Sequence, residues 1–163
     1  MSTNEQAPFL SSVMSIEPQW IDYNGHLNMA YYNVMFDRAI DEFWLELGIG
    51  PAYKKTRNGS TFTAECHLRY LREIHLGDPV QIAIHLLGAD EKRLHTFEEM
   101  RHADDRWLSA TSENMTIHVD MGLRKTAPFP PDIREHIASV AKAHANVPRP
   151  EGIGRSIAMP ARR

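Results

Sequence analysis

Three polar residues near the N-terminus have the types and the spacing to carry chemistry at a carbonyl group: Asp22, Asn24 and His26. A carboxylate acts as a base or as a nucleophile toward a carbonyl carbon. An amide and an imidazole beside it can orient the carboxylate or a water molecule. If this segment is extended, alternate side chains point to the same side, so all three would share one surface. Gly25 allows a sharp turn or the close approach of a ligand.

The residues that follow predict a long, mostly buried helix over residues 28–47. Apolar side chains recur at three- and four-residue spacing and therefore share one helix face; they are Tyr32, Phe36, Ala39, Ile40, Phe43, Trp44 and Leu47. Asn28 is a suitable N-cap, and Gly48 is a suitable end. A helix N-terminus offers free N–H donors and favours negative charge. We expect the N–H groups near Asn28 and Met29 to polarise a carbonyl oxygen held beside Asp22.

A purely structural interpretation of the same segment is also open. Asn-Gly is a common turn sequence, and Asp22 would then cap the turn while His26 is a surface histidine. Local spacing alone does not separate the two interpretations. The position directly in front of a core helix favours catalysis, because a loop without function would usually be simpler.

Composition indicates one domain and excludes several classes of function. The chain has 163 residues and a formal net charge of −3, so no general affinity for nucleic acid is indicated. Its one cysteine excludes an intrachain disulfide and suits a reducing compartment. There is no signal-peptide pattern, and no apolar run approaches the roughly 20 residues that span a bilayer. We expect a cytoplasmic protein that binds neither nucleic acid nor membrane.

The rest of the chain predicts an antiparallel sheet. A first strand is expected over 13–20 and a loop over 48–61. Four alternating runs then predict strands, at 62–71, 80–87, 94–102 and 107–120, before a second helix from about 130 to 145. The helix at 28–47 is the only element apolar enough to cover a sheet face. The predicted fold class is α+β, with an antiparallel sheet wrapped around one long helix.

The predicted domain covers residues 1–146, and residues 147–163 form a tail with proline and arginine. We expect this tail to be disordered or packed on a neighbouring subunit. The histidines are scattered, without the spacing or the cysteine partners of a zinc site, so no metal is expected. There is no glycine-rich phosphate loop and no serine nucleophile elbow.

Two other polar groups have both a solvated and a functional interpretation. Glu65 lies in a row with His67 and Arg69 on a predicted strand. This row is the solvated face of the sheet unless Glu65 faces a cleft and orients water or a cationic substrate. Lys92 and Arg93 are solvated in the simplest interpretation, but they are natural contacts for the phosphates of a substrate.

The segment W-I-D-Y-N-G-H-L-N-M-A-Y-Y, residues 20–32, resembles the D-x-x-G-H-V-N-N-x-x-Y signature of hotdog-fold acyl-CoA thioesterases of the 4-hydroxybenzoyl-CoA thioesterase type. The resemblance covers about residues 13–137, including Y-L-R-E-I-H-L-G-D-P-V, K-R-L-H-T-F and R-K-T-A-P-F-P. Met29 departs from it, since many relatives have a second Asn there. It implies a hotdog fold, a homodimer or tetramer with sites between subunits, and hydrolysis of an acyl-CoA substrate without a cofactor.

The resemblance also implies roles for individual residues. Asp22 stands at the position of the catalytic carboxylate, and the D-x-N-x-H spacing is also similar to that of plant acyl-carrier-protein thioesterases. The implied catalytic residues are Asp22, Asn24, His26 and Asn28, with the backbone at Met29 polarising the thioester carbonyl. Lys92 and Arg93 match a basic segment that contacts coenzyme A phosphates in relatives.

At a closer level, P-Q-W-I-D-Y-N-G-H-L-N, K-R-L-H-T-F and I-H-V-D resemble betainyl-CoA thioesterases of carnitine breakdown. The acyl group of such a substrate carries a trimethylammonium cation. Aromatic faces and a carboxylate suit this cation, and the candidates in this chain are Trp20, Tyr23, Tyr32, Phe36 and Glu65.

Other functions on the same fold remain open. Hotdog enoyl-CoA hydratases carry D-x-N-P-x-H, with Asp and His five residues apart, whereas Asp22 and His26 are four apart and proline is absent. A non-catalytic acyl-binding module is a second alternative. The carrier could be coenzyme A or an acyl-carrier protein, and Asp22 could be a general base or a nucleophile.

Overall fold

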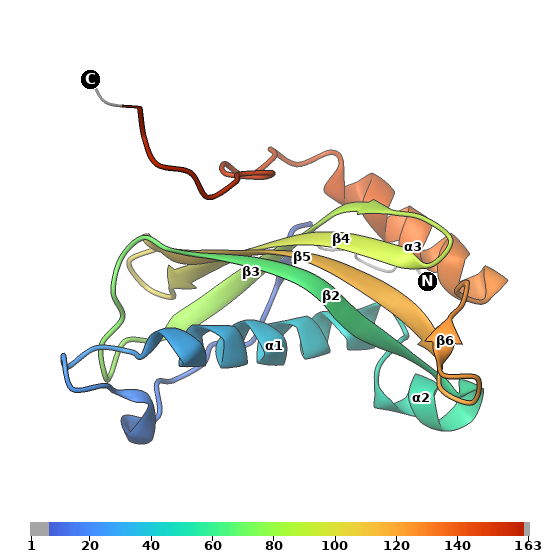
Figure 1. Ribbon diagram of the computed structural model, residues 1–163, viewed down its shortest axis with the longest axis horizontal. Coiled ribbons are helices and arrows are strands. Elements are labelled where there is room, and N and C mark those ends of the chain that lie inside the picture. The colour runs from blue at the N-terminus through green and yellow to red at the C-terminus, as the bar shows by residue number, and fades with distance from the viewer. Residues whose placement is uncertain (1–6, 162–163) are drawn as a thin grey trace.

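A six-stranded antiparallel sheet arches over one long helix in the computed structural model, which describes residues 7–161 (Figure 1). The strands are β1 (Phe9–Leu10), β2 (Gly59–Tyr70), β3 (Val80–Ala89), β4 (Arg93–His102), β5 (Leu108–Asp120) and β6 (Lys125–Thr126). Their order is β1-β3-β4-β5-β2, with β6 beside β5, so β2 lies at an edge of the sheet. The helices are α1 (Met29–Glu46), α2 (Pro51–Arg57) and α3 (Pro131–His144).

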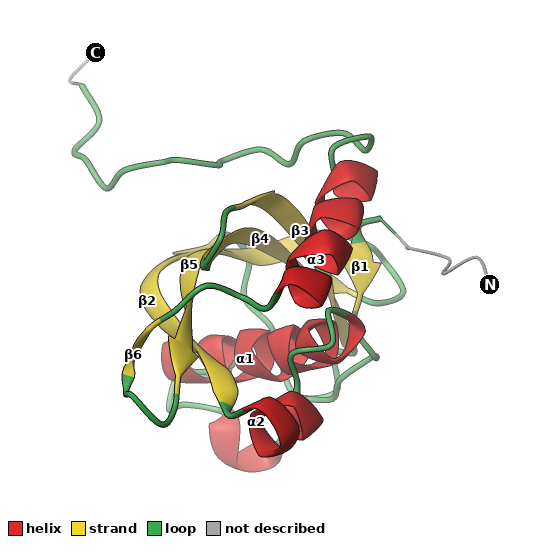
Figure 2. Ribbon diagram, turned by 90° about the vertical axis from the view of Figure 1, so that its right-hand side faces the viewer, coloured by secondary structure: helices red, strands yellow, loops and turns green. Residues whose placement is uncertain are grey.

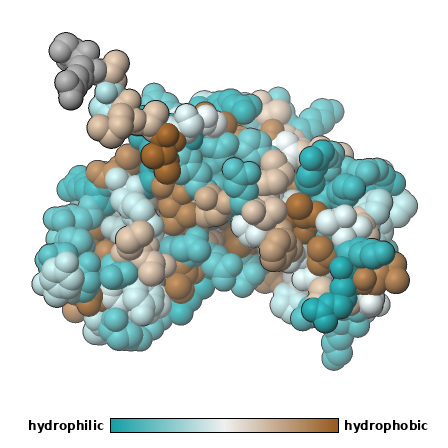
Figure 3. Space-filling view, viewed as in Figure 1, coloured by the Kyte–Doolittle hydropathy of each residue, from teal (hydrophilic) through white to brown (hydrophobic). Residues whose placement is uncertain are grey.

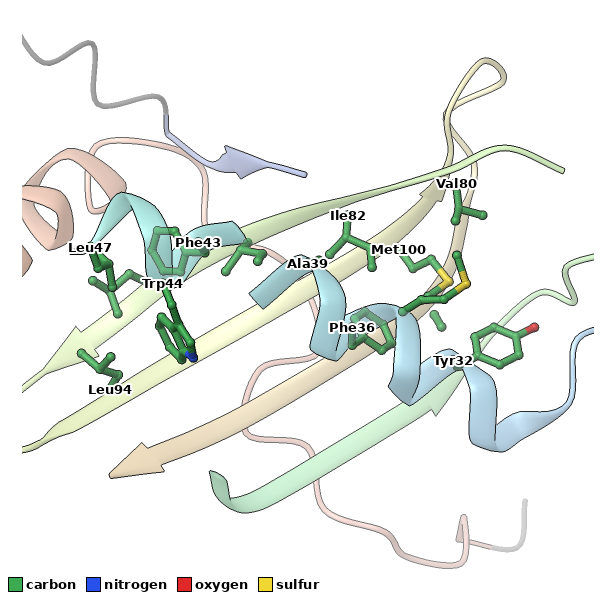
Figure 4. Close-up of a cluster of buried hydrophobic side chains, with 14 of the residues drawn as sticks. Tyr32, Phe36, Ala39, Phe43, Trp44, Leu47, Val80, Ile82, Leu94 and Met100 are labelled. Carbon is green, nitrogen blue, oxygen red and sulfur yellow. The ribbon is translucent and has the colours of Figure 1, made fainter. Parts of the chain in front are cut away.

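Helix α1 forms where the apolar periodicity predicts it. The Asn28 side chain accepts a hydrogen bond from the Ala30 N–H at 3.0 Å, and so caps the first turn. Gly48, with φ +73°, follows the last turn in a conformation that glycine adopts without strain. The apolar stripe of α1 packs against the sheet, as Figure 4 shows for Phe36, Ala39 and Phe43 beside Ile82 and Met100. This packing is the centre of the hydrophobic core.

Two predicted elements are wrong. Residues 13–20 do not form a strand: Met14 makes an isolated bridge to Val80, and Pro18–Trp20 is a turn of 3-10 helix, because proline cannot donate a ladder hydrogen bond. Residues 48–61 are not all loop, since they contain α2. Pro51 stands at the first helical position, which it favours. Only Tyr53 of this short helix is buried, so its sequence carried little apolar signal.

A bulge in β2 changes which side chains share a face. The register between β2 and β5 shifts between Thr63 and Glu65. The regular alternation predicted over 62–71 would put Phe62 and Cys66 on one face and is therefore wrong, because the bulge puts them on opposite faces. Thr63 and Cys66 instead line one cavity together with residues of α1.

The last helix and the tail lie in different places, because α3 also contacts α1: His136 Nε2 lies 2.9 Å from the Glu46 carbonyl oxygen, and the His144 ring centre lies 5.8 Å from that of Phe43. Helix α3 packs against β3 (Figure 2), where the Leu86 N–H donates to His144 Nδ1 at 2.8 Å. The tail from residue 147 runs above the sheet face opposite α1, and the Gly154 N–H donates to Glu113 Oε2 at 2.7 Å. Residues 1–6 of the predicted domain and 162–163 of the predicted tail lie outside the described residues. Over residues 7–161, no helix has the length and apolarity to cross a bilayer.

The core predicts a measurable cost for removing an α1 side chain. Phe43 is completely buried, with ring centroids 5.3 Å from Phe9 and 5.7 Å from Trp44. Phe43→Ala should lower the free energy of unfolding by about 3–5 kcal/mol in urea titrations, through lost burial and the cavity left behind. Val34→Ala, on the exposed side of the same helix, should change it by less than about 1 kcal/mol. Equal effects of the two variants would contradict this packing.

Candidate active site

The segment before α1 is a closed turn and not the extended strand assumed from its spacing. The Asp22 N–H donates to the His26 carbonyl at 3.0 Å, and the Asn28 N–H donates to the Trp20 carbonyl at 3.0 Å. Gly25 has φ +85°, a conformation that strains other residues. The turn is thus fixed by backbone bonds, and it ends directly at the helix N-cap.

A cavity of about 450 Å³ opens beside this turn and the first turn of α1. It is lined by Asp22, Tyr23, Asn24, His26, Leu27, Asn28, Met29, Tyr32, Tyr70, Leu71, Arg72 and Glu73. The structure therefore brings the three polar residues of the sequence motif to one cavity. They come together because the segment folds into a turn, and not because alternate residues of an extended strand share one side.

The Asp22 carboxylate is held from one side and borders the cavity from the other. Its side chain is 14% exposed. Oδ1 accepts the Asn24 backbone N–H at 2.8 Å, and Oδ2 lies 3.8 Å from His26 Nδ1. His26 Nε2 lies 3.8 Å from a Glu73 carboxylate oxygen. Asn24 thus orients Asp22 through its backbone, and the His26 ring lies between two carboxylates.

The N-terminus of α1 supplies the hydrogen-bond donor that a carbonyl oxygen needs. Asn28 Oδ1 is already engaged in capping Ala30, so the side chain of Asn28 serves the helix. Among the hydrogen bonds of residues 7–161, none uses the Met29 N–H, as expected for the first helical residue. The Tyr70 hydroxyl donates to the Met29 carbonyl at 3.1 Å and ties β2 to this turn.

Sequence reasoning missed five residues of the cavity, of which three are polar: Tyr70, Arg72 and Glu73. The Arg72 guanidinium lies 3.9 Å from the centre of the Trp107 ring, and Glu73 reaches both His26 and His75. The signal was present, since these residues open the Y-L-R-E-I-H segment that matched the family pattern. Their place in the cavity becomes visible only in the fold, where the end of β2 lies beside the first turn of α1.

The proposed aromatic residues are distributed over different surroundings. Tyr32 is buried in the cavity wall, and its hydroxyl accepts the Ile74 N–H at 3.2 Å. Tyr23 is at the rim, 97% exposed. Trp20 is buried outside the cavity lining, stacked on Tyr31, with the Arg38 guanidinium 4.8 Å from its ring centre. The ring of Trp20 is thus already occupied by a protein cation.

Glu65 does not reach the Asp22 cavity within this chain. It lines a separate groove with His95, Glu113 and residues 154–157 of the tail. The carboxylate that sequence reasoning offered for a cationic acyl group is therefore placed elsewhere.

Lys92 and Arg93 also lie far from Asp22 within one chain. Arg93 pairs with Ile117 of β5, and Ile117 pairs with Phe62 of β2. Tyr70 at the cavity is eight residues further along β2, about 26 Å away at the rise of a strand. Arg93 Nε also donates to Asp90 Oδ2 at 2.7 Å, which partly neutralises its charge.

A second, smaller cavity of about 130 Å³ lies between α1 and the strands β4, β5 and β2. It is lined by Asn33, Phe36, Asp37, Ile40, Thr63, Cys66, Glu98, Ser112, Asn114 and Thr116. Glu98 is 2% exposed, and its Oε1 accepts the Asn114 amide at 2.8 Å. Over the described residues its Oε2 has no partner. Burial, reinforced by the nearby Asp37 charge, raises the pKa of Glu98 well above the usual range.

Within residues 7–161 there is no cluster of three histidine, cysteine, aspartate or glutamate side chains that could hold a metal ion. The chemistry available at the first cavity is that of a carboxylate, an imidazole and the N–H groups of a helix end. This set suits the attack of water on a polarised carbonyl.

Comparison with known proteins agrees with this geometry. Residues 16–137 match the thioesterase-like superfamily. The chain is 37% identical to the betainyl-CoA thioesterase of Pseudomonas aeruginosa PAO1, over 88% of this chain and 90% of that protein. It is 35% identical to the L-carnitine dehydrogenase/betainyl-CoA thioesterase of Ruegeria pomeroyi, over 94% of this chain but 31% of that longer protein.

Among solved structures, a Staphylococcus aureus protein in complex with coenzyme A superposes with a TM-score of 0.86 at 28% identity. The match covers 97% of this chain and 100% of that one. The similarity confirms the predicted hotdog fold, and the superfamily match confirms the resemblance carried by residues 20–32.

The buried Glu98 predicts a pH-dependent stability. Its raised pKa means that the folded chain keeps a proton that the unfolded chain loses above about pH 4.3. The folded state therefore loses stability as pH rises from there through the folded pKa. Glu98→Gln removes this loss, so its stability relative to wild type should increase with pH in urea titrations. A difference that stays constant from pH 4 to 8 would contradict the burial of an ionisable Glu98. Exposed Glu135→Gln is the control.

Proposed function

We propose that this chain, which belongs to the thioesterase-like superfamily, hydrolyses acyl-CoA thioesters at the cavity in front of α1. The observation that carries the proposal is that the Asp22 carboxylate and the free Met29 N–H line the same cavity. The reaction does not require a strong general acid at the cavity, because the coenzyme A thiolate is a good leaving group. Relatives named as betainyl-CoA thioesterases support the same reaction.

The reaction consumes one water and breaks the carbon–sulfur bond. As a general base, Asp22 takes a proton from water while the water oxygen attacks the thioester carbon. As a nucleophile, Asp22 attacks that carbon itself, and water then hydrolyses the mixed anhydride. In both routes the Met29 N–H and the end of α1 stabilise the oxyanion, and the coenzyme A thiolate leaves. Asn24 and His26 hold Asp22 in position.

The proposed substrate is a coenzyme A thioester of a small acyl group, with betainyl-CoA, which would give betaine, as the first candidate. Two relatives carry that substrate in their names, and the bound coenzyme A of the S. aureus structure supports coenzyme A as the carrier. No cofactor takes part in this proposal. We place the enzyme in the cytoplasm, where acyl-CoA is available and a single free cysteine stays reduced.

We further propose a homodimer in which two β2 strands pair. Strand β2 is 12 residues long, and no strand within residues 7–161 pairs with its outer side. Unprotected edges of this length favour pairing with another chain. Phe62 is 63% exposed on this strand, and Figure 3 shows apolar side chains among hydrophilic ones on the face that carries β2 and α1.

Antiparallel pairing about the middle of β2 would also bring the second copy's basic turn toward the cavity. The Gly59 end of one β2 then lies beside the Tyr70 end of the other. The turn with Lys92 and Arg93 in the second copy is then a few strand widths from the Asp22 cavity, and no longer a whole strand length away. This is the arrangement in which these two residues could contact coenzyme A phosphates.

Asp22→Asn should keep the fold and lower coenzyme A release at least about a hundredfold, because the amide neither takes a proton nor attacks the thioester. A thiol-detection assay over a panel of acyl-CoAs measures this, with circular dichroism to check the fold. Asp104→Asn, in an exposed turn, is the control and should match wild type. Near-normal turnover by the Asp22 variant would reject the catalytic role.

Phe62→Arg should convert the dimer to a monomer, because it places a charge on the pairing edge. Light scattering after size exclusion measures the mass of the particle. Val13→Arg introduces the same charge at an exposed position beside β3, away from β2 in the strand order, and should leave the dimer intact. A wild-type monomer, or a dimer unaffected by Phe62→Arg, would exclude pairing through β2.

A further inference from the structure

We infer that the cavity around Glu98 is the subsite for a cationic acyl group, with the carboxylates of Glu98 and Asp37 facing a quaternary ammonium. This inference rests on the proposed thioesterase function and adds to it the residues that select the substrate. Of the residues predicted from the sequence to bind this cation, Trp20 and Glu65 line neither cavity along α1, and Glu98 and Asp37 take their place in this inference.

The first observation is a buried polar group without a partner in the core. On the α1-facing side of β4, Glu98 lies between Leu94 and Met100 in alternation, and both of these are fully buried (Figure 4). Oε1 is satisfied by Asn114, but Oε2 has no partner over the described residues. An unsatisfied buried carboxyl is costly, so its presence where an apolar side chain would fit indicates a ligand that supplies the missing interaction.

The second observation is the charge of the cavity. Asp37 faces it from α1, and its lining contains no lysine, arginine or histidine. Cys66 faces it from β2, and the residues from β5 are the neutral Ser112, Asn114 and Thr116. Phe36 adds an aromatic ring to the wall. Carboxylates with an aromatic ring are the surroundings that recognise quaternary ammonium groups.

The third observation is the distance from the proposed reaction centre. Glu98 pairs with Ser112, and Ser112 pairs with Leu68, two residues before Tyr70 on β2. The Tyr70 hydroxyl bonds to Met29 at the helix N-terminus. Glu98 is therefore about 7 Å along the strands and two strand spacings, about 10 Å, across the sheet from Tyr70 at the backbone; both side chains point to the α1 side of the sheet, which narrows this separation. Because the betainyl nitrogen is two bonds from the thioester carbon, the trimethylammonium group reaches Glu98 only when the acyl group is directed along α1 toward this cavity.

The two cavities also follow one another along α1. Tyr32 lines the first and its neighbour Asn33 lines the second. A thioester whose carbonyl lies at Met29 can thus direct its acyl group toward Glu98 while coenzyme A extends outward.

The test compares two substrates of the same shape, betainyl-CoA and 3,3-dimethylbutyryl-CoA, in which carbon replaces the charged nitrogen. Wild type should prefer the cation in kcat/KM by about tenfold or more, from its interaction with the buried Glu98 and with Asp37 at the cavity wall. Glu98→Gln keeps the shape of the side chain and should remove most of this preference. It should lower kcat/KM for betainyl-CoA and leave kcat/KM for the neutral compound unchanged. Asp37→Asn should reduce it in part. Exposed Glu135→Gln should leave both values unchanged.

Binding separates failure of this inference from failure of the proposed function. Asp22→Asn lacks the reactive carboxylate, so calorimetry on it gives the Kd of both thioesters directly. A preference for the cation in Kd that Glu98→Gln abolishes supports the subsite even if wild type hydrolyses neither compound, a result that would reject only the thioesterase proposal. Equal Kd values for the two thioesters, or a preference unchanged by Glu98→Gln, would overturn the inference even if both are hydrolysed.

Proton release gives a readout that a merely structural role of Glu98 would not move. Because its burial holds the proton on Glu98, a bound cation should favour ionisation and expel that proton. Calorimetry in buffers of different ionisation enthalpy should show release with betainyl-CoA and none with the neutral compound. Glu98→Gln should abolish the release. Equal release from both compounds in wild type would contradict the inference.

Discussion

The docking of α1 across the concave face of the sheet is the interaction on which the rest of the structure depends. Its apolar stripe, centred on Phe36 and Phe43, fixes the axis of the helix against β3 and β5. Because the helix cannot slide, its N-terminus is held at one place, where Asn28 caps it and the Met29 N–H stays free. The closed turn from Trp20 to Asn28 then places Asp22 in the lining of the same cavity as Met29. The groups proposed to react are thus held in place by hydrophobic packing elsewhere in the molecule.

The same docking creates the polar cavity beside the core. At this cavity the side chains that face α1 change from the apolar Ile82 and Met100 to the polar Glu98 and Asn114. Removing a carboxyl group from water is unfavourable, and its raised pKa expresses that cost. In the proposed subsite, binding of the acyl group offsets this cost, and the nearby Asp37 implies that the recognised group is positively charged. Position of the carbonyl and selection of the acyl group therefore both derive from α1.

The sequence predicted the parts that local chemistry determines. The 28–47 helix followed from its periodicity and caps, and the motif at Asp22 followed from residue types and family resemblance. What failed depended on long-range contacts. No residue type at Ala64 indicates the β2 bulge, and α2 has a single buried residue. Glu65 and Glu98 are both carboxylates on strands, so residue type does not distinguish them. Only the register of β4 with β5 shows that Glu98 points at α1, so the choice between them needed the fold.

The central claim is that one thioester spans two places on α1, its carbonyl at Met29 and its acyl group at Glu98. A crystal structure of Asp22→Asn with betainyl-CoA tests it most directly. The account predicts the carbonyl oxygen about 3 Å from the Met29 nitrogen, with the trimethylammonium group against Glu98 and Asp37. A thioester bound in the groove of Glu65 and Glu113, or an acyl group turned away from Glu98, would contradict it.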